Sequence, residues 1–183
     1  VACYEAVMKS ITIAQQMGER PDILFTVFKE NINQLEEVYR KITQPNGLVL
    51  IINPVFDYNE VETGENLSEQ DLDYLRDFGK QPLVYLNDGF IELMKDGGNQ
   101  ISNPVCKAGS STVVISPENH LISPCYHLEE KTFPLTNGLA EVYNSAKVQA
   151  SLQRAGKLEA CQGCTINCYM QPSFAVELNK YFW

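Results

Sequence analysis

Cysteine is the residue type in this chain of 183 residues whose spacing points most clearly to chemistry. Five of the six cysteines lie in the second half, as Cys106, then Cys125, then Cys161-x-x-Cys164, then Cys168. Two thiolates on a tight, glycine-containing turn can chelate one metal centre, and a distant pair of thiolates can complete its coordination. The spacing therefore predicts either an iron–sulfur cluster or a structural zinc site, because soft thiolates suit both.

Disulfides are the alternative use of these cysteines. We expect no signal peptide and therefore a cytoplasmic protein, in which structural disulfides are rare. Metal binding is accordingly favoured over disulfides. The spacing alone does not distinguish a cluster from zinc.

Other reactive side chains are weaker candidates. Cys3 lies within a helical pattern near its apolar stripe, which favours a buried structural thiol. His127 could bind or tune a metal centre, although a surface loop position is the commoner role. With two histidines and no nucleophile elbow, the chain offers no basis for a hydrolase triad. An acidic loop follows a predicted strand, and its default role is a solvated loop: Asp57, Glu60, Glu62 and Glu65.

Composition narrows the class of protein. The chain is 44% hydrophobic and has a net charge of -9. A folded protein with a substantial core is expected, and nucleic acid is an unfavourable partner because its phosphates repel acidic surfaces. No apolar stretch approaches the ~20 residues that a transmembrane helix needs.

The elements that must position the cysteines divide into two regions, 1–100 and 101–183. The first region has helical and strand patterns in alternation, which predicts an α/β fold with parallel strands. Its expected elements are a helix from Tyr4 to Met17, strands at 23–28 and 48–53 buried on both faces, a helix capped by Asn31 with Gln34, a helix starting at Ser68 with Asp71, and a helix over 88–94. The chain begins directly in the first helical pattern, so we expect it to be part of a longer protein.

The second region predicts a small module around a β-hairpin. Residues 112–115 and 121–122 flank a turn in which Asn119 can adopt a left-handed conformation. Cys106 precedes this hairpin and Cys125 follows it. Two short helices, over 139–145 and 146–155, lead to the Cys161-x-x-Cys164 turn.

This order of motifs resembles the carboxy-terminal half of the radical S-adenosylmethionine (radical SAM) superfamily. The segment Thr26-Val27-Phe28-Lys29-Glu30-Asn31 is similar to the fifth strand of that family's partial (β/α)6 barrel as it enters a helix, and 48–56 is similar to the sixth strand. Cys106-Lys107-Ala108-Gly109, the hairpin, Ser123-Pro124-Cys125, the helix at 139–145 and Cys161-x-x-Cys164 are similar, in order, to the SPASM or twitch extension. The likeness covers nearly the whole chain and is most specific in the second region.

The resemblance implies a fold and a chemistry. It implies the end of a partial barrel followed by an α+β module that carries an auxiliary 4Fe–4S cluster. The parent protein would be an iron–sulfur oxidoreductase with S-adenosylmethionine and a catalytic 4Fe–4S cluster, acting on a small-molecule or peptide substrate with an electron donor such as ferredoxin or flavodoxin. The competing hypothesis is a non-catalytic, zinc-stabilised interaction module.

The chain also departs from the family pattern. It lacks the Cys-x3-Cys-x2-Cys loop that holds the catalytic cluster, so we expect this chain alone to be inactive. A full SPASM domain has about seven cysteines for two clusters, whereas this region has five, so one cluster is expected, as in twitch domains. Its ligands would be Cys106 and Cys125 with two of Cys161, Cys164 and Cys168, and we favour Cys161 and Cys164.

Overall fold

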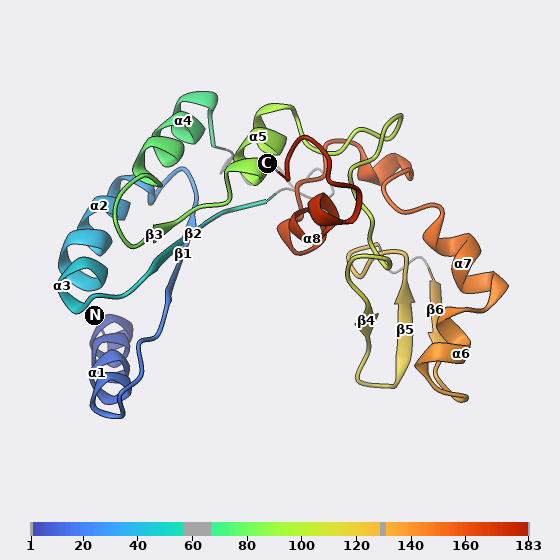
Figure 1. Ribbon diagram of the computed structural model, residues 1–183, viewed down its shortest axis with the longest axis horizontal. Helices are drawn as coiled ribbons and strands as arrows, with labels where there is room; N and C mark the ends of the chain where they lie inside the picture. The colour runs from blue at the N-terminus through green and yellow to red at the C-terminus, as the bar shows by residue number, and fades with distance from the viewer. Residues whose placement is uncertain (1, 57–66, 129–130, 183) are drawn as a thin grey trace. The chain divides into compact units, whose positions relative to one another are not determined.

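The computed structural model describes residues 2–56, 67–128 and 131–182, and the chain forms two compact units (Figure 1). Unit 1 comprises 1–55 and 62–87, and unit 2 comprises 56–61 and 88–183. The division falls before residue 88 rather than near residue 100, because helix α5 (Asp88–Lys95) packs against helix α8 (Asn167–Glu177) of the second unit.

Unit 1 contains a three-stranded parallel sheet in the order β1-β2-β3. The strands are β1 (Ile23–Val27), β2 (Leu50–Pro54) and β3 (Val84–Tyr85). Two of the three match the sequence prediction, and β3 was not expected because two residues give no usable periodicity. Helix α1 (Ala2–Gln16) precedes the sheet and ends before Gly18, whose φ of +83° favours glycine.

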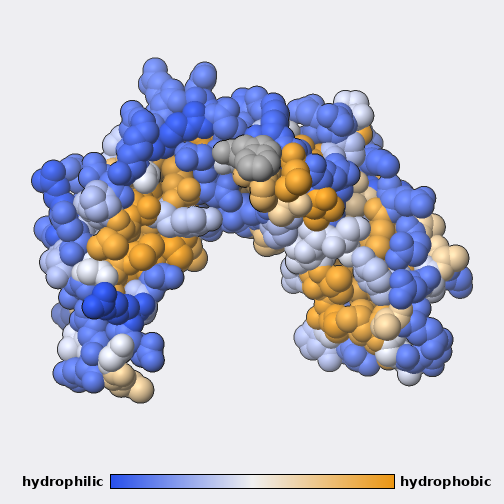
Figure 2. Space-filling model, in the orientation of Figure 1, coloured by the Kyte–Doolittle hydropathy of each residue, from blue (hydrophilic) through white to orange (hydrophobic). Residues whose placement is uncertain are grey.

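One face of this sheet is covered and the other is open. Val27 and Leu50 are fully buried. On the opposite face, Leu24 is 62% exposed and Tyr85 is 53% exposed, and both are in register with Ile51. Figure 2 shows apolar side chains gathered over these strands. The prediction that β1 is buried on both faces is therefore wrong within the described residues.

The connection between β1 and β2 is an irregular helix. It begins with the 3-10 turn η1 (Ile32–Gln34), continues as α2 (Leu35–Val38) and widens into the π-helical η2 (Tyr39–Thr43) before α3 (Gln44–Asn46). The predicted cap by Asn31 is wrong: Asn31 Oδ1 accepts from the amide of Phe28, and its Nδ2 donates to the carbonyl of Thr26. Asn31 therefore fixes the end of β1 and leaves the helix start without a side-chain cap.

Helix α4 (Glu69–Phe78) begins with the predicted capping box. The Ser68 hydroxyl accepts from the amide of Asp71, and Asp71 Oδ2 accepts from the amide of Ser68 at 2.8 Å. Lys29 also contacts Asp71 Oδ2 at 2.7 Å, so the helix start is tied to the end of β1. The lysine and the Ser68 groups lower the pKa of Asp71 to about 2.

Unit 2 is built around an antiparallel sheet, β4-β5-β6, in which Val114 is in register with Ile122. Its strands are β4 (Val114–Ile115), β5 (His120–Ser123) and β6 (Lys131–Pro134), and its later helical elements are α6 (Leu139–Tyr143), α7 (Ala146–Leu152), the 3-10 turn η3 (Glu159–Cys161) and α8. The hairpin is confirmed, with Asn119 at φ +61°. The sequence did not predict β6 and α8.

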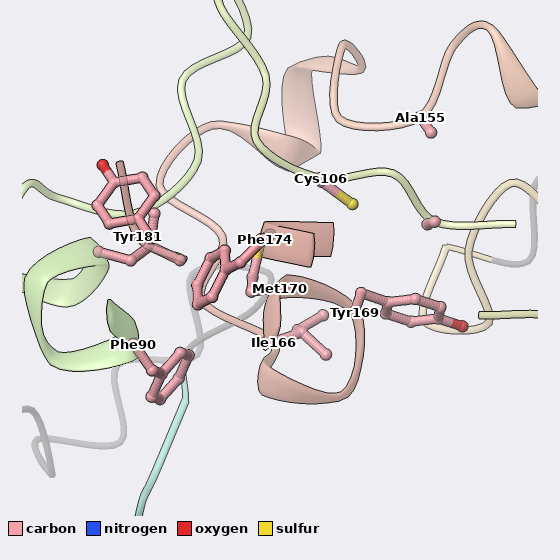
Figure 3. Packing of buried hydrophobic residues seen from close by; sticks show 10 residues of the cluster. Phe90, Cys106, Ala155, Ile166, Tyr169, Met170, Phe174 and Tyr181 are labelled. Carbon is pink, nitrogen blue, oxygen red and sulfur yellow. The ribbon is translucent and has the colours of Figure 1, made fainter. Parts of the chain in front are cut away.

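The largest core cluster of unit 2 lies beside the cysteines. Phe90 of α5 and Met170 and Phe174 of α8 are buried in it, and the rings of Phe174 and Tyr181 lie 5.4 Å apart (Figure 3). Cys106 belongs to the same cluster. The first turn of α8 therefore serves both as core and as one wall of the cysteine region.

The mixed α/β fold class is thus confirmed, while the assignment of the strands to a partial barrel remains a prediction. In the parts of the chain that are described, no helix has the length and apolar character needed to cross a membrane.

Candidate metal centre

Four cysteines from three segments of unit 2 line one pocket, which we call the thiol pocket. Cys106 lies on the loop that leads to β4, and Cys125 lies two residues after the end of β5. Cys161 ends η3, and Cys164 lies on the turn between η3 and α8. None of the five described cysteines of this unit forms a disulfide. The structure therefore brings together the set of ligands that the sequence favoured.

Cys168 lies apart from this set. It is exposed in the first turn of α8, and its sulfur does not line the pocket. It still interacts electrostatically with Cys125 and Cys164. Of the three candidates for the last two ligands, Cys161 and Cys164 line the pocket and Cys168 does not.

The rest of the pocket wall is mainly apolar. It includes Ile166, Tyr169 and Met170 of the α8 region, with Leu128 and the backbone of Gly156. Figure 3 shows Cys106 in the same cluster of buried side chains as Ile166, Tyr169 and Met170. The cavity has a volume of about 20 Å³. The pocket as it stands has room for about one water molecule.

Burial disfavours ionised thiols in this pocket. It raises the pKa of Cys106 to about 12 and that of Cys164 to about 11, and the neighbouring cysteines raise both values further. Burial also raises the pKa of Cys125. Several thiolates can coexist in such a place only when a positive centre compensates their charge.

Backbone amides already point at the sulfurs. The amide of Ala108 donates to Cys106, the amide of His127 to Cys125 and the amide of Ile166 to Cys164. In each case the donor is two residues after the cysteine, so each thiol lies on a tight turn that presents an N–H to it. Each of these bonds lowers the pKa of its thiol and so partly opposes the effect of burial.

Two side chains complete the surroundings of Cys125. The Tyr169 hydroxyl hydrogen-bonds the Cys125 sulfur and lowers its pKa. His127 also lines the pocket, with its ring 6.2 Å from that of Tyr169 and 6.1 Å from that of Phe56, and burial lowers its pKa. His127 lies on a turn and is partly buried, as a loop position implies, and its ring also packs among aromatic side chains at the pocket.

Other sequence candidates lie outside the pocket or outside the described residues. The acidic residues Asp57, Glu60, Glu62 and Glu65 are outside the described residues, as is the side chain of Cys3. Within the described ranges, no group of three or more His, Cys, Asp or Glu side chains is arranged so that it could hold a metal ion. The four thiols line the wall of a pocket rather than meet at one point.

Sequence reasoning missed two residues that shape the site, Asn99 and Tyr169. Asn99 is fully buried and hydrogen-bonded to the segments that carry Cys106 and Cys161. Its sequence context, after Gly97 and Gly98, is typical of an exposed turn, so no local signal distinguishes it. Tyr169 could have been suspected only from its position directly after Cys168.

Comparison with protein-family models, with curated proteins and with solved structures finds no match to this chain.

Proposed function

We propose that the thiol pocket binds one iron–sulfur cluster through Cys106, Cys125, Cys161 and Cys164. The observation that carries this proposal is that these four thiols, from three separate segments, line one mostly apolar pocket without forming disulfides. The chemistry of the donor set fits, since clusters are held by four cysteine thiolates. Zinc shares that donor preference and is the competing occupant.

Binding of a metal centre would change the protonation state of the pocket. Thiols with raised pKa values are protonated near neutral pH, and they lose their protons when they bind a metal centre. The amide donors of Ala108, His127 and Ile166 then face thiolate ligands, and such hydrogen bonds to sulfur tune the reduction potential of a cluster.

The free volume sets a condition on binding. A cluster is larger than the water-sized space now present, so cluster binding must move part of the wall outward. Leu128, Ile166 and Met170 supply side chains that can move, and methionine adapts readily because it is unbranched. The turns that carry the sulfurs need not unfold for this adjustment.

We further propose that the chain corresponds to the carboxy-terminal half of a radical SAM oxidoreductase. In this proposal unit 1 is the end of a partial barrel, and the sequential parallel order β1-β2-β3 with intervening helices supports it. Unit 2 is then the twitch-like module. An auxiliary cluster supplies one-electron chemistry or a Lewis-acidic contact when bound.

The catalytic reaction itself is not assigned to this chain. The printed sequence has no Cys-x3-Cys-x2-Cys motif, so reconstituted and reduced protein is expected to form no 5′-deoxyadenosine from S-adenosylmethionine. Substrate, S-adenosylmethionine and an electron donor such as ferredoxin or flavodoxin belong to the proposed parent. Formation of 5′-deoxyadenosine above background would show that the clusters are misassigned.

Metal analysis tests the occupant of the pocket. The protein is treated anaerobically with reductant, then offered ferrous iron with sulfide, or zinc, in parallel preparations. The proposal expects a visible iron–sulfur chromophore with matching iron and sulfide contents after desalting. Colourless protein that retains no iron in the first preparation and stoichiometric zinc in the second would support the zinc-stabilised module instead.

A further inference from the structure

Asn99 makes hydrogen bonds that join the segments carrying three of the four thiols of the pocket. It lies between α5 and Cys106 and is completely buried. Its side-chain Oδ1 accepts from the amides of Val105 at 3.0 Å and Cys106 at 3.2 Å. Its Nδ2 donates to the carbonyls of Gly156 at 2.8 Å and Cys161 at 3.0 Å. The side-chain amide thus uses both its donors and both its acceptor positions.

The backbone of Asn99 extends the same network to the Cys161-x-x-Cys164 turn. Its amide donates to the carbonyl of Cys164 at 3.0 Å, and its carbonyl accepts from the amide of Gly163 at 2.8 Å. This pairing needs glycine on one side, because a Cβ at Gly98 would lie 2.3 Å from the carbonyl oxygen of Gly163. The segment at Asn99 therefore lies directly against the turn that carries two thiols.

An asparagine side chain matches these neighbours in both chemistry and length. Two amide donors lie on one side of the Asn99 side chain and two carbonyl acceptors on the other, which requires an amide in one orientation. Aspartate keeps the acceptor oxygen but places a second oxygen against two carbonyls. Alanine leaves two amides and two carbonyls buried without their partner, which is costly in a site closed to water.

We infer that Asn99 is a positioning residue that holds Cys106, Cys161 and Cys164 in place through protein hydrogen bonds alone, so that the thiol pocket is organised before any metal binds. That these thiols are metal ligands rests on the proposed function, whereas the hydrogen-bonded arrangement does not. Cys125 lies outside this network, since Tyr169 and the amides after β5 hold it. The side chain of Asn99 should therefore control Cys106 and Cys161, its backbone should help to hold Cys164, and neither should control Cys125.

Cysteine alkylation in metal-free protein tests this selectivity. Chelator-treated, reduced protein is pulsed with iodoacetamide, and mass spectrometry gives the modification rate of each cysteine. Asn99→Ala removes the side-chain bonds but keeps the backbone bonds to Gly163 and Cys164, so it should raise the rates of Cys106 and Cys161 by about tenfold or more and that of Cys164 by less, with Cys125 within about twofold of its rate in the unaltered chain. Asn103→Ala, at an exposed asparagine of the same segment, should leave all four rates unchanged.

Asn99→Asp separates the two sides of the network. It retains an acceptor for the Val105 and Cys106 amides and loses the donors to Gly156 and Cys161. The rate of Cys161 should therefore rise more than that of Cys106. Equal acceleration of all four thiols in either variant, or no acceleration in Asn99→Ala, would overturn the inference.

Amide exchange of the unaltered, metal-free chain keeps the test independent of whether variants fold. The amides of Val105, Cys106 and Gly163 are bonded to Asn99 and should exchange as slowly as core amides of α8. Exchange at the rate of an exposed loop would contradict the inference. Neither measurement involves a metal, so failure to assemble a cluster would count against the proposed function alone.

Discussion

Tyr169 donates its hydroxyl hydrogen to the sulfur of Cys125 while accepting a 2.8 Å hydrogen bond from the backbone amide of Tyr126. The hydrogen bond from the Tyr126 amide fixes the position of the Tyr169 hydroxyl oxygen, so the hydroxyl hydrogen faces the Cys125 thiol. The bond stabilises negative charge on the sulfur, which is the state that a metal ligand requires. Through this contact a core side chain of α8 acts on the electronic state of the pocket.

Tyr169→Phe should therefore make a bound cluster harder to reduce. Loss of one hydrogen bond to a ligand sulfur, worth on the order of 1 kcal/mol, lowers a one-electron midpoint potential by roughly 40 mV. Tyr181→Phe is the matched control, because Tyr181 belongs to the same core cluster but bonds to Asp96. Redox titration of both variants should show a shift only for Tyr169→Phe, and equal potentials in the two would contradict the assigned contact.

Gly156 should be intolerant of a side chain because of its packing and not only because of its backbone. It has a φ of +74°, and a Cβ there would lie 2.7 Å from Pro104 Cβ and 3.1 Å from Cys106 Cβ. Gly138 has a φ of +90°, and a Cβ there would meet nothing within 4 Å. Gly138→Ala should thus cost about 1–3 kcal/mol of stability from backbone strain alone, since its φ of +90° with ψ of +157° is nearly restricted to glycine. Gly156→Ala should cost ~1–3 kcal/mol from its close contacts in addition to its own backbone strain.

Urea denaturation of metal-free protein measures both glycine variants. Gly156→Ala should also speed alkylation of Cys106, which Gly138→Ala should not. Equal losses of stability in the two variants would show that the approach of Gly156 to Cys106 is unimportant.

The capping box of α4 predicts a pH dependence in unit 1. Because Lys29 and Ser68 lower the pKa of Asp71 to about 2 from an ordinary value of 3.8, the ionised carboxylate stabilises the folded state above pH 3.8, and this contribution is lost as pH falls towards 2. Asp71→Asn should cost about 1 kcal/mol at neutral pH. The loss of unfolding free energy in Asp71→Asn, measured by urea denaturation, should shrink between pH 3.8 and about 2. A loss that is constant with pH would contradict the assignment.

The open face of the unit 1 sheet predicts self-association. Leu24 is 62% exposed and Tyr85 is 53% exposed, and a flat apolar face beside an edge strand favours contact between chains. Leu24→Lys should reduce association in light scattering while changing the free energy of unfolding by less than about 0.5 kcal/mol. Unchanged association in this variant would place the contact elsewhere.

Local signals predicted the elements that depend on local chemistry. Residue type and spacing predict a helix cap at Ser68 and Asp71 and a turn at Asn119. They also predict a binding site at the paired cysteines. The prediction that Asn31 caps a helix was wrong because its side chain hydrogen-bonds the backbone at the end of β1, a partner that only the tertiary structure provides. Asn99 could not be found, since its side-chain partners are up to 62 residues away in sequence.

The thiol pocket likewise combines features that local sequence predicts with features that depend on the tertiary structure. Spacing alone grouped five cysteines and left two of Cys161, Cys164 and Cys168 as the last ligands, and the exclusion of Cys168 from the pocket depends on the point at which α8 begins. Asn167 starts that helix, so Cys168 lies on its exposed first turn while Cys164 remains in the preceding loop inside the pocket. A shift of a few residues in the helix start, which sequence patterns do not resolve, would have exchanged the two.

Anaerobic reconstitution of Cys164→Ala and Cys168→Ala side by side tests the central claim most directly. Iron, sulfide and visible absorption are measured for each variant after desalting. Cys168→Ala should retain the full chromophore with about four irons per chain, whereas Cys164→Ala should lose it, because only Cys164 lines the pocket with Cys106, Cys125 and Cys161. A chromophore that survives Cys164→Ala and disappears in Cys168→Ala, or that depends on neither cysteine, would contradict the four-thiol site.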